Sequence, residues 1–323
     1  MVKHFNIPFI IGTGSGGGKI ISKLIVKMAK IAVNSSWKDL DALPEEVVKV
    51  RAGGGHGSGM DPKQGEKDYV KLGGREGLRE AIEKVLSESG LEKDQVDLIP
   101  VVISAGHGFG SGSGPKIVED LRKWFPKTPI IAFITSPFAW EGYAVLFKAN
   151  QCFEKVAEHA GTIVIDNNYI AQIAGGGESI PKILMKADNY ISSSIEVFLK
   201  IATSQTILAG IDRTDLMKVC DRGSILLFNR VFKKDEPIEN IFDSDSMLNN
   251  WWKGKVAYTG VKILALIQSP VIHRTIPEKI FKASEDRFGH IELFKPAMFQ
   301  GESFRLSLIV GGVKYFKDVE GYA

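Results

Sequence analysis

Residues 104–116 read SAGHGFGSGSGPK and follow an apolar run at 98–103 that predicts a buried strand. From Gly108 to Gly114 four glycines alternate with other residues, and helical spacing of apolar side chains begins at Ile117. A strand that leads into such a segment and then a helix places unpaired backbone N–H groups where the helix dipole favours an anion. Glycine lets the backbone approach phosphate oxygens closely, and Ser111 and Ser113 can add hydroxyl donors. The stretch predicts a phosphate site, with a flexible glycine loop that binds nothing as the alternative.

The composition is that of an ordinary globular chain. Its 323 residues are enough for two domains with separate cores. The net charge of +3, from 41 basic and 38 acidic side chains, gives no general case for binding nucleic acid or a membrane. Two cysteines cannot build a disulfide framework, and no window approaches the ~18 apolar residues of a membrane helix. The N-terminus lacks the pattern of a secretory signal, so we expect a cytoplasmic protein.

A second glycine-rich segment, GTGSGGGKI, begins at Gly12 after an apolar run at 6–11 that predicts another strand. Gly12, Gly14 and Gly17 match the dinucleotide pattern G-x-G-x-x-G, and a helical pattern follows. Alone, this match favours a Rossmann oxidoreductase that uses NAD. The next strand ends in Asn34, where such enzymes hold the ribose with an acidic side chain, and this difference weakens the NAD interpretation.

A third glycine-rich segment, RAGGGHGSGMDPKQG at 51–65, leads into a helix at Asp61 and Pro62, where proline suits the first turn. Apolar runs at 130–134 and 162–165 predict further strands, followed by TSPFAWEG and DNN. Strands that alternate with helices indicate a parallel sheet covered on both faces. Ligands bind such sheets at the carboxyl ends of the strands, where all of these loops fall. The convergence of three glycine loops predicts a nucleotide ligand.

The second half of the chain has a different pattern of apolar residues. Apolar residues recur at three- and four-residue steps from 179 to about 206, which predicts a helix roughly 40 Å long. Strand-like runs with one helix near 277–288 follow. The expected fold is α/β, a Rossmann-like nucleotide-binding domain with a parallel sheet at 1–178, a long central helix at 179–207 and a C-terminal α+β domain at 208–323.

The order of these loops resembles the tubulin/FtsZ superfamily over about residues 8–312. GFGSGSG is similar to that family's phosphate loop G-G-G-T-G-[ST]-G, and GTGSGGGK to its G-x-G-G-x-G-x-N, with Lys19 where asparagine is usual. GMDPKQG resembles G-x-N-P-x-x-G. SPFAWEG resembles K-P-F-x-F-E-G, in which Glu141 matches the acidic residue that touches the sugar or phosphates. Val145 stands where that family has an arginine.

The resemblance also implies how a base is recognised. Asn167 matches the asparagine that contacts guanine, Asp188 matches a second guanine contact, and Leu184 stands where an aromatic side chain stacks. A carboxylate accepts from guanine N1–H and N2–H₂ together, which adenine cannot supply. The alternative for Asp188 is a solvated helix residue. The expected nucleotide contacts are Gly12, Gly14, Ser15, Gly16, Gly17, Lys19, Asn34, Gly59, Asp61, Pro62, Gly106, Gly108, Phe109, Gly110, Ser111, Gly112, Ser113, Gly114, Pro137, Glu141, Asn167, Leu184 and Asp188.

The segment GIDRTDL resembles the family's synergy loop N-x-D-x-x-D, with Gly210 in place of asparagine. In that family the loop enters the nucleotide site of the next subunit, and its carboxylates position or activate the attacking water. The resemblance therefore implies that Asp212 and Asp215 are catalytic, and that 208–323 is an activating and assembly domain. The alternative is purely structural, since Asp212 suits a helix cap and Asp215 suits the first turn.

The resemblance as a whole implies a GTPase that binds GTP or GDP with Mg²⁺ and polymerises head to tail with itself. We expect a role in plasmid or phage DNA partitioning, because NSSWKDLD and DNN look similar to TubZ-type sequences and the sequence stops at Ala323. An FtsZ-like role in division or cell shape is the alternative. An adaptor protein is a further expected partner, whereas nothing indicates direct binding of nucleic acid or membrane. A non-polymerising nucleotide-binding protein or an NAD-dependent oxidoreductase is the alternative of another class.

Overall fold

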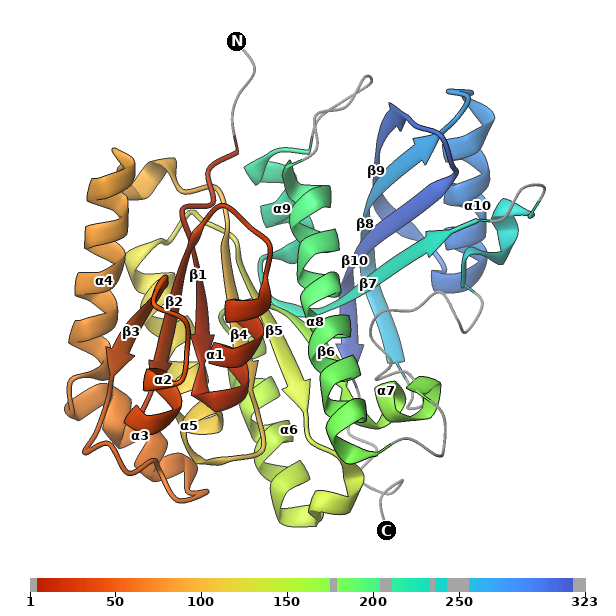
Figure 1. The fold of residues 1–323 in the computed structure, drawn as a ribbon. Helices are drawn as coiled ribbons and strands as arrows, with labels where there is room; N and C mark the ends of the chain where they lie inside the picture. The colour runs from red at the N-terminus through yellow and green to blue at the C-terminus, as the bar shows by residue number, and fades with distance from the viewer. Residues whose placement is uncertain (1–4, 175–178, 204–210, 233–235, 243–255, 316–323) are drawn as a thin grey trace.

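The computed structural model describes residues 5–174, 179–203, 211–232, 236–242 and 256–315. Within these residues ten strands form one sheet in the order β3-β2-β1-β4-β5-β6-β7-β10-β8-β9 (Figure 1). The strands are β1 (Phe9–Thr13), β2 (Ala29–Asn34), β3 (Val47–Arg51), β4 (Ile99–Ser104), β5 (Ile130–Ser136), β6 (Gly161–Asp166), β7 (Gly223–Val231), β8 (Val256–Ser269), β9 (Ile291–Gln300) and β10 (Arg305–Tyr315).

The helices cover both faces of the sheet (Figure 1). They are α1 (Gly14–Lys23), α2 (Trp37–Asp41), α3 (Pro62–Lys71), α4 (Gly74–Ser89), α5 (Gly108–Trp124), α6 (Tyr143–Ala157), α7 (Asn167–Ala174), α8 (Ile180–Thr203), α9 (Arg213–Cys220) and α10 (Thr275–Phe288). Short 3₁₀ turns are η1 (Lys93–Gln95), η2 (Ala139–Glu141) and η3 (Ile238–Phe242). Helices α1, α2, α8 and α9 pack on one face, and α3 to α6 pack on the other.

Strands β1 to β6 are parallel, and each central one is buried on both faces. Side chains of adjacent strand residues pack into the two cores on opposite faces of the sheet, because side chains alternate along a strand. Ile10 packs beneath α1 and α8, whereas Phe9 and Ile11 pack beneath α4 and α5. The near-continuous apolar runs read from the sequence are those of a doubly covered parallel sheet. The predicted α/β fold with a parallel sheet is confirmed.

The C-terminal strands continue the same sheet. The first two residues of β7 pair in parallel with β6, and β10 then runs antiparallel to both β7 and β8. Helix α10 and η3 cover a separate core there, which includes Phe228 and Phe288. Helix α8 packs on the core shared by β5, β6 and β7, so the long helix lies along the junction of the two halves. The domain boundaries remain a prediction.

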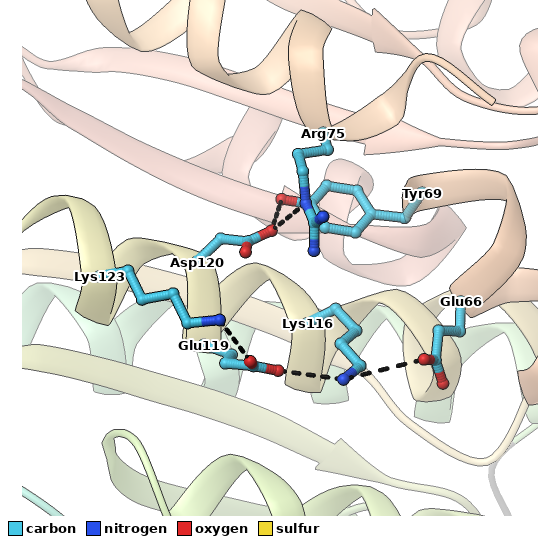
Figure 2. Close-up of polar contacts among 7 residues, drawn as sticks. All are labelled: Glu66, Tyr69, Arg75, Lys116, Glu119, Asp120 and Lys123. Carbon is cyan, nitrogen blue, oxygen red and sulfur yellow. Dashed lines mark hydrogen bonds and ion pairs between the residues drawn. The ribbon is translucent and has the colours of Figure 1, made fainter. Parts of the chain in front are cut away.

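Polar contacts join α3, α4 and α5 behind the sheet (Figure 2). Asp120 on α5 accepts hydrogen bonds from Tyr69 Oη on α3 and from Arg75 Nε on α4. The preceding residue of α5, Glu119, pairs with both Lys116 and Lys123 (Figure 2). The Asp120 bonds hold α5, the helix that begins in the glycine-rich stretch at 104–116, against α3 and α4.

Three details differ from the sequence expectations. The first strand begins at Phe9 instead of residue 6, because the N–H of Asn6 donates to Asp97 and lies outside the ladder. Strand β3 was not predicted from its short alternating run. Most of the glycine-rich stretch that was expected to be a loop is helical, since α5 begins at Gly108.

Candidate nucleotide-binding site

Two helices begin side by side at the carboxyl edge of the sheet. Helix α1 follows β1 and helix α5 follows the adjacent β4. Neither has a side-chain cap or an acidic residue in its first turn. A Cβ atom at Gly14 would lie 3.4 Å from the backbone N of Gly110, so the two helix starts touch. Their unpaired N–H groups converge on one place, which favours a polyanion.

The glycines in these helices allow close backbone packing. A Cβ atom at Gly110 would lie 1.9 Å from the carbonyl oxygen of Ser104, and one at Gly112 would lie 2.0 Å from that of Pro62. Inside α1, a Cβ atom at Gly17 would lie 2.7 Å from the carbonyl oxygen of Val102. Glycine costs a helix about 1 kcal/mol relative to alanine, yet at these positions a side chain cannot fit. Packing therefore explains why a glycine-rich stretch is helical.

The remaining glycines and neighbours of the loops lie along the same edge. Gly12, Gly108, Phe109, Gly114 and Pro137 are buried, and Gly16 and Gly106 pack against Ser104 and Pro137 respectively. Phe109, which stands where the resemblance has a glycine, joins the core beneath α4 and α5. These buried residues contribute to the candidate site through their backbone and through their packing.

The two serines of α5 are used differently. Ser113 is fully buried; its hydroxyl donates to the carbonyl oxygen of Phe109 at 2.7 Å and lies 2.7 Å from Thr13 Oγ1. In this arrangement the hydroxyl of Ser113 is bound within the protein, and its contact with phosphate stays a prediction. Ser111 Oγ accepts from the N–H of Gly106 at 2.7 Å and keeps its own proton for another acceptor.

A small polar cluster lies at the end of β2. Asn34 donates from Nδ2 to Ser15 Oγ at 3.2 Å, and Ser15 donates in turn to Asp39 on α2. The Oδ1 of Asn34 accepts from the N–H of Ser36 at 3.3 Å. Asn34 therefore holds α1 and α2 together at the carboxyl edge, next to the first glycine segment.

The third glycine segment reaches the start of α5. Asp61 accepts from the N–H of Lys63 at 2.9 Å and caps α3, with Pro62 in the first turn, as expected. A Cβ atom at Gly108 would lie 2.8 Å from the carbonyl oxygen of Ser58. Gly59 is exposed with φ +54°, and Met60 beside it has φ +60°, a rare value for a residue with a side chain. This strained turn lies beside the start of α5, at the carboxyl edge of the sheet.

Glu141 faces the cap of α5. Its Oε1 accepts from the N–H of Phe138 at 2.8 Å, and its Oε2 lies 3.2 Å from Nε2 of His107. His107 was not predicted as a site residue, although it lies inside the opening stretch. Val145 is buried against Gly106.

Asn167 begins α7 at the end of β6, and its Oδ1 is buried without a hydrogen-bond partner. The next residue, Asn168, is fully engaged: its Oδ1 accepts from the N–H of Ala139 and its Nδ2 donates to Asp166. A buried acceptor left unpaired costs about 1–3 kcal/mol, so it is a natural point for a donor from a ligand.

The other two base-contact candidates lie on α8. Asp188 forms an ion pair with Lys23 of α1, with 2.6 Å between Oδ2 and Nζ. This pair was not predicted, and it leaves Oδ1 of Asp188 available. Leu184 lies one turn nearer the start of α8, and its side chain is 44% exposed.

Helix α9, which Asp212 caps and which contains Asp215, lies at the opposite, amino edge of the sheet (Figure 1). Arg213 beside them donates to the carbonyl oxygen of Asp94, in the turn that precedes β4, at 2.6 Å. The two aspartates cap α9 reciprocally, each side chain accepting from the other's N–H at 2.9 Å. Asp215 is buried and ion-paired with Lys295 of β9, whereas Asp212 is exposed. Gly210 lies outside the described residues.

The ionisation of Asp212 follows from these contacts. Partial burial alone would raise its pKa, but hydrogen bonds from the backbone of Asp215 and Thr214 and the nearby Lys295 cation lower the pKa below its usual value. Asp212 is therefore a carboxylate at neutral pH. It can accept a hydrogen bond from water.

Two kinds of feature are absent from the described part of the chain. It holds no group of three or more histidine, cysteine, aspartate or glutamate residues that could bind a metal ion. None of its helices is long and apolar enough to cross a membrane.

Comparisons with known proteins agree with this geometry. Residues 63–175 match the GTPase domain of the tubulin/FtsZ family, a span that runs from α3 through α5 to α7. CetZ2 from Haloferax volcanii, solved as a GTPγS-bound protofilament, has the same fold with a TM-score of 0.76 at 23% identity, over 97% of this chain and 95% of that one. The chain is thus similar to the tubulin/FtsZ family GTPase domain over residues 63–175, and it shares its whole fold with CetZ2.

Other proteins that the chain resembles are comparably distant. Cell division protein FtsZ 1 from Pyrococcus abyssi is 27% identical over 232 residues, which are 68% of this chain and 56% of that protein. TubZ of Clostridium botulinum phage c-st shares the fold with a TM-score of 0.67 at 15% identity, over 95% of this chain and 91% of that one. The chain spans 56–58% of the length of the first curated relatives that it matches.

Proposed function

We propose that this protein binds and hydrolyses GTP and polymerises head to tail with copies of itself. The phosphates would lie at the touching starts of α1 and α5, where neither helix carries a capping side chain or an early acidic residue. The exposed turn at Gly59 and the free proton of Ser111 supply further polar groups beside them. Among the described residues this is where backbone N–H groups from two helices converge.

The site suits a nucleotide held with Mg²⁺. Mg²⁺ is usually bound through substrate phosphates, waters and one or two carboxylates, so it needs no dedicated protein cage. Bound there, the ion would neutralise phosphate charge, which is the main requirement of phosphoryl transfer. The protein's part is to fix the phosphates against the helix starts.

Guanine is the base that the polar groups favour. The unpaired Oδ1 of Asn167 and the free Oδ1 of Asp188 are both acceptors. Guanine presents N1–H and N2–H₂ as donors on one edge, whereas adenine has an unprotonated N1 there. Leu184 offers an apolar surface beside these groups.

The single observation that carries the assembly proposal is the separation of the two halves of the site. The glycine-rich starts of α1 and α5 lie at the carboxyl edge of the sheet, and α9, which Asp212 caps, lies at the amino edge (Figure 1). One molecule cannot bring Asp212 to its own nucleotide. A head-to-tail contact joins unlike edges and generates an open filament when it does not close.

The two aspartates have different roles in this proposal. Asp212 is exposed and ionised, so it would orient the attacking water in the neighbour's site. Asp215 is buried, caps α9 and pairs with Lys295, so it would hold Asp212 in place. The proposal thus gives the two aspartates different roles, whereas the resemblance implies only that both are catalytic.

The test compares turnover with protein concentration. We expect the hydrolysis rate per molecule to rise with concentration, together with sedimentation in GTP but not in GDP or ATP. Asp212→Asn should bind GTP and sediment as the parent does, yet hydrolyse at least tenfold more slowly. Asp94→Asn removes an exposed carboxylate at the same edge and should change nothing. A monomeric sample whose rate per molecule is independent of concentration contradicts the proposal.

For the cellular role we propose plasmid or phage DNA partitioning or positioning, with an adaptor as a partner. The support is the TubZ-like sequence of NSSWKDLD and the fold shared with a phage TubZ. Division or cell-shape duty has comparable support from FtsZ and CetZ relatives. Fluorescent fusions separate the two: filaments that move with a plasmid or phage genome support the first, and a midcell ring or a change of cell shape supports the second.

A further inference from the structure

His107 comes immediately before α5, and its side chain points to η2 instead of capping the helix. The backbone of His107 is extended, and its ring makes no hydrogen bond to the start of α5. Nε2 of the ring lies 3.2 Å from Oε2 of Glu141, whose Oε1 accepts from the N–H of Phe138. The imidazole is half-exposed, and the structure gives it no other hydrogen bond or ion pair to a described residue. One ring nitrogen is therefore left for another partner.

The bond to Glu141 decides what that second nitrogen can do. A carboxylate only accepts hydrogen bonds, so Nε2 of His107 carries a proton. In the neutral ring Nδ1 is then an acceptor, which cannot bind a phosphate oxygen. In the imidazolium Nδ1 is a second donor, and the ring also carries a positive charge. Only the protonated form of His107 suits an anion.

The resemblance leads us to expect a positive charge close to Glu141. Arginine is usual four residues after this glutamate, and Val145 stands there instead. Val145 packs on Gly106, since a Cβ atom on that glycine would lie 2.8 Å from Cγ1 of the valine. Gly106 directly precedes His107, so the histidine lies beside position 145 and reaches Glu141 from there.

The charged groups around His107 are of both signs. Those on the elements packed near it are Glu141 of η2, Asp61 and Lys63 at the start of α3, Lys148 of α6 and Asp166 of β6. The ammonium group of Lys148 donates to the carbonyl oxygen of Met60 at 2.8 Å. The positive end of the α5 dipole opposes a cation at this point, whereas the Glu141 carboxylate favours one. Phosphates at the start of α5 would add negative charge beside the ring and shift this balance toward the protonated form.

We propose that His107, as an imidazolium, binds a phosphate oxygen of the nucleotide and supplies the positive charge that the resemblance implies at position 145. Nucleotide binding then takes up a proton from solvent, and this proton stays on Nδ1 between the ring and the phosphate. The inference rests on the proposed function and adds a residue that the glycine motifs did not indicate. It makes the affinity for nucleotide depend on pH.

The experiment measures GDP binding by isothermal titration calorimetry, because GDP avoids both hydrolysis and assembly. The parent is compared with His107→Gln, in which glutamine keeps a donor for Glu141 but carries no charge. We expect the variant to bind about fivefold more weakly than the parent at pH 6.5 and equally at pH 8.5, where imidazole is neutral. At pH 7, in buffers of different ionisation enthalpy, the parent should take up about half a proton more than the variant. The protons of GDP itself cancel in this comparison.

His107→Arg is charged at every pH, so at pH 8.5 it should bind GDP more tightly than the parent, with no more proton uptake than His107→Gln. Two exposed histidines are the matched controls: His56 in the third glycine segment and His290 between α10 and β9. His56→Gln and His290→Gln should bind GDP and take up protons as the parent does.

Three results overturn the proposal: His107→Gln binds as the parent at pH 6.5, it is weakened equally at both pH values, or the proton uptake is lost in His56→Gln instead. A parent protein that binds no GDP at either pH contradicts the proposed function itself, which is a separate result.

Discussion

The Nε atom of Arg75 donates to Oδ2 of Asp120 at 2.7 Å, and this ion pair joins α4 to α5 behind the sheet (Figure 2). The hydroxyl of Tyr69 donates to the same oxygen at 3.0 Å. Burial raises the pKa of Tyr69, and the Asp120 carboxylate raises it further. Asp120 is therefore a buried carboxylate with two donors from two helices.

We expect Asp120→Ala to lower the free energy of unfolding by about 3 kcal/mol, because it leaves Tyr69 buried without its acceptor and Arg75 without its partner. Asp120→Asn keeps an acceptor and should cost less. Urea unfolding monitored by circular dichroism measures both. Glu83→Ala, which removes a largely exposed partner of Arg79, is the control and should change the free energy by less than about 0.5 kcal/mol.

Gly110→Ala should be poorly tolerated, because its methyl group would lie 1.9 Å from the carbonyl oxygen of Ser104. Relief of that clash moves α5 away from β4, and we expect a loss of roughly 2–4 kcal/mol of stability together with loss of nucleotide binding. Gly54→Ala is the comparison, since no atom lies within 4 Å of its methyl position. Melting temperatures that fall equally for both variants would show that the close approach is unimportant.

The Glu119 ion pairs should give a pH-dependent contribution to stability. Hydrogen bonds from Lys123 and Lys116 lower the pKa of Glu119 from 4.5 to about 2. A lowered carboxyl pKa means that the stabilisation is complete above about pH 4.5 and is lost as the pH falls toward 2.

The measurement compares the parent protein with Glu119→Gln in urea at pH 6, 4 and 3. The difference in unfolding free energy should be largest at pH 6 and shrink with acidification. Its size should stay below about 1 kcal/mol, because Lys123 is well exposed and solvent screens the pairs. A difference that grows on acidification contradicts this assignment.

Lys295→Met should affect hydrolysis through Asp212. The Lys295 cation is one of the groups that lower the pKa of Asp212, so its loss should raise that pKa and move the acidic limb of the rate profile to higher pH. Asp215, which is buried, also loses its ion-pair partner, and we expect about 2–3 kcal/mol less stability. Lys218→Met removes an exposed charge from α9 and should leave the pH profile unchanged.

Local patterns predicted the parts of the site that depend on short spacings. Asp61 with Pro62 at the start of α3 and the glycines at the ends of β1 and β4 could all be placed from the sequence. The partners of the functional side chains could not. Lys295 lies 80 residues from Asp215 and Lys23 lies 165 residues from Asp188, so only the folded sheet brings them together.

The glycine-rich stretch shows the second limit of local reasoning. Glycine propensity favours a loop, whereas the structure forms a helix from Gly108. Tertiary packing decided the outcome, because α5 can lie against β4 and α3 only where side chains are missing. Neither periodicity nor composition contains that information.

The glycine-rich starts of α1 and α5 lie at one end of the sheet, and Asp212, at the start of α9, lies at the other. This separation has a genetic consequence. If each active unit takes its nucleotide from one molecule and its carboxylate from the next, two inactive proteins can complement each other. Asp188→Ala, defective in the base pocket, would still offer Asp212 to an Asp212→Asn neighbour whose GTP is correctly bound. An equimolar mixture of the two should recover turnover that neither shows alone.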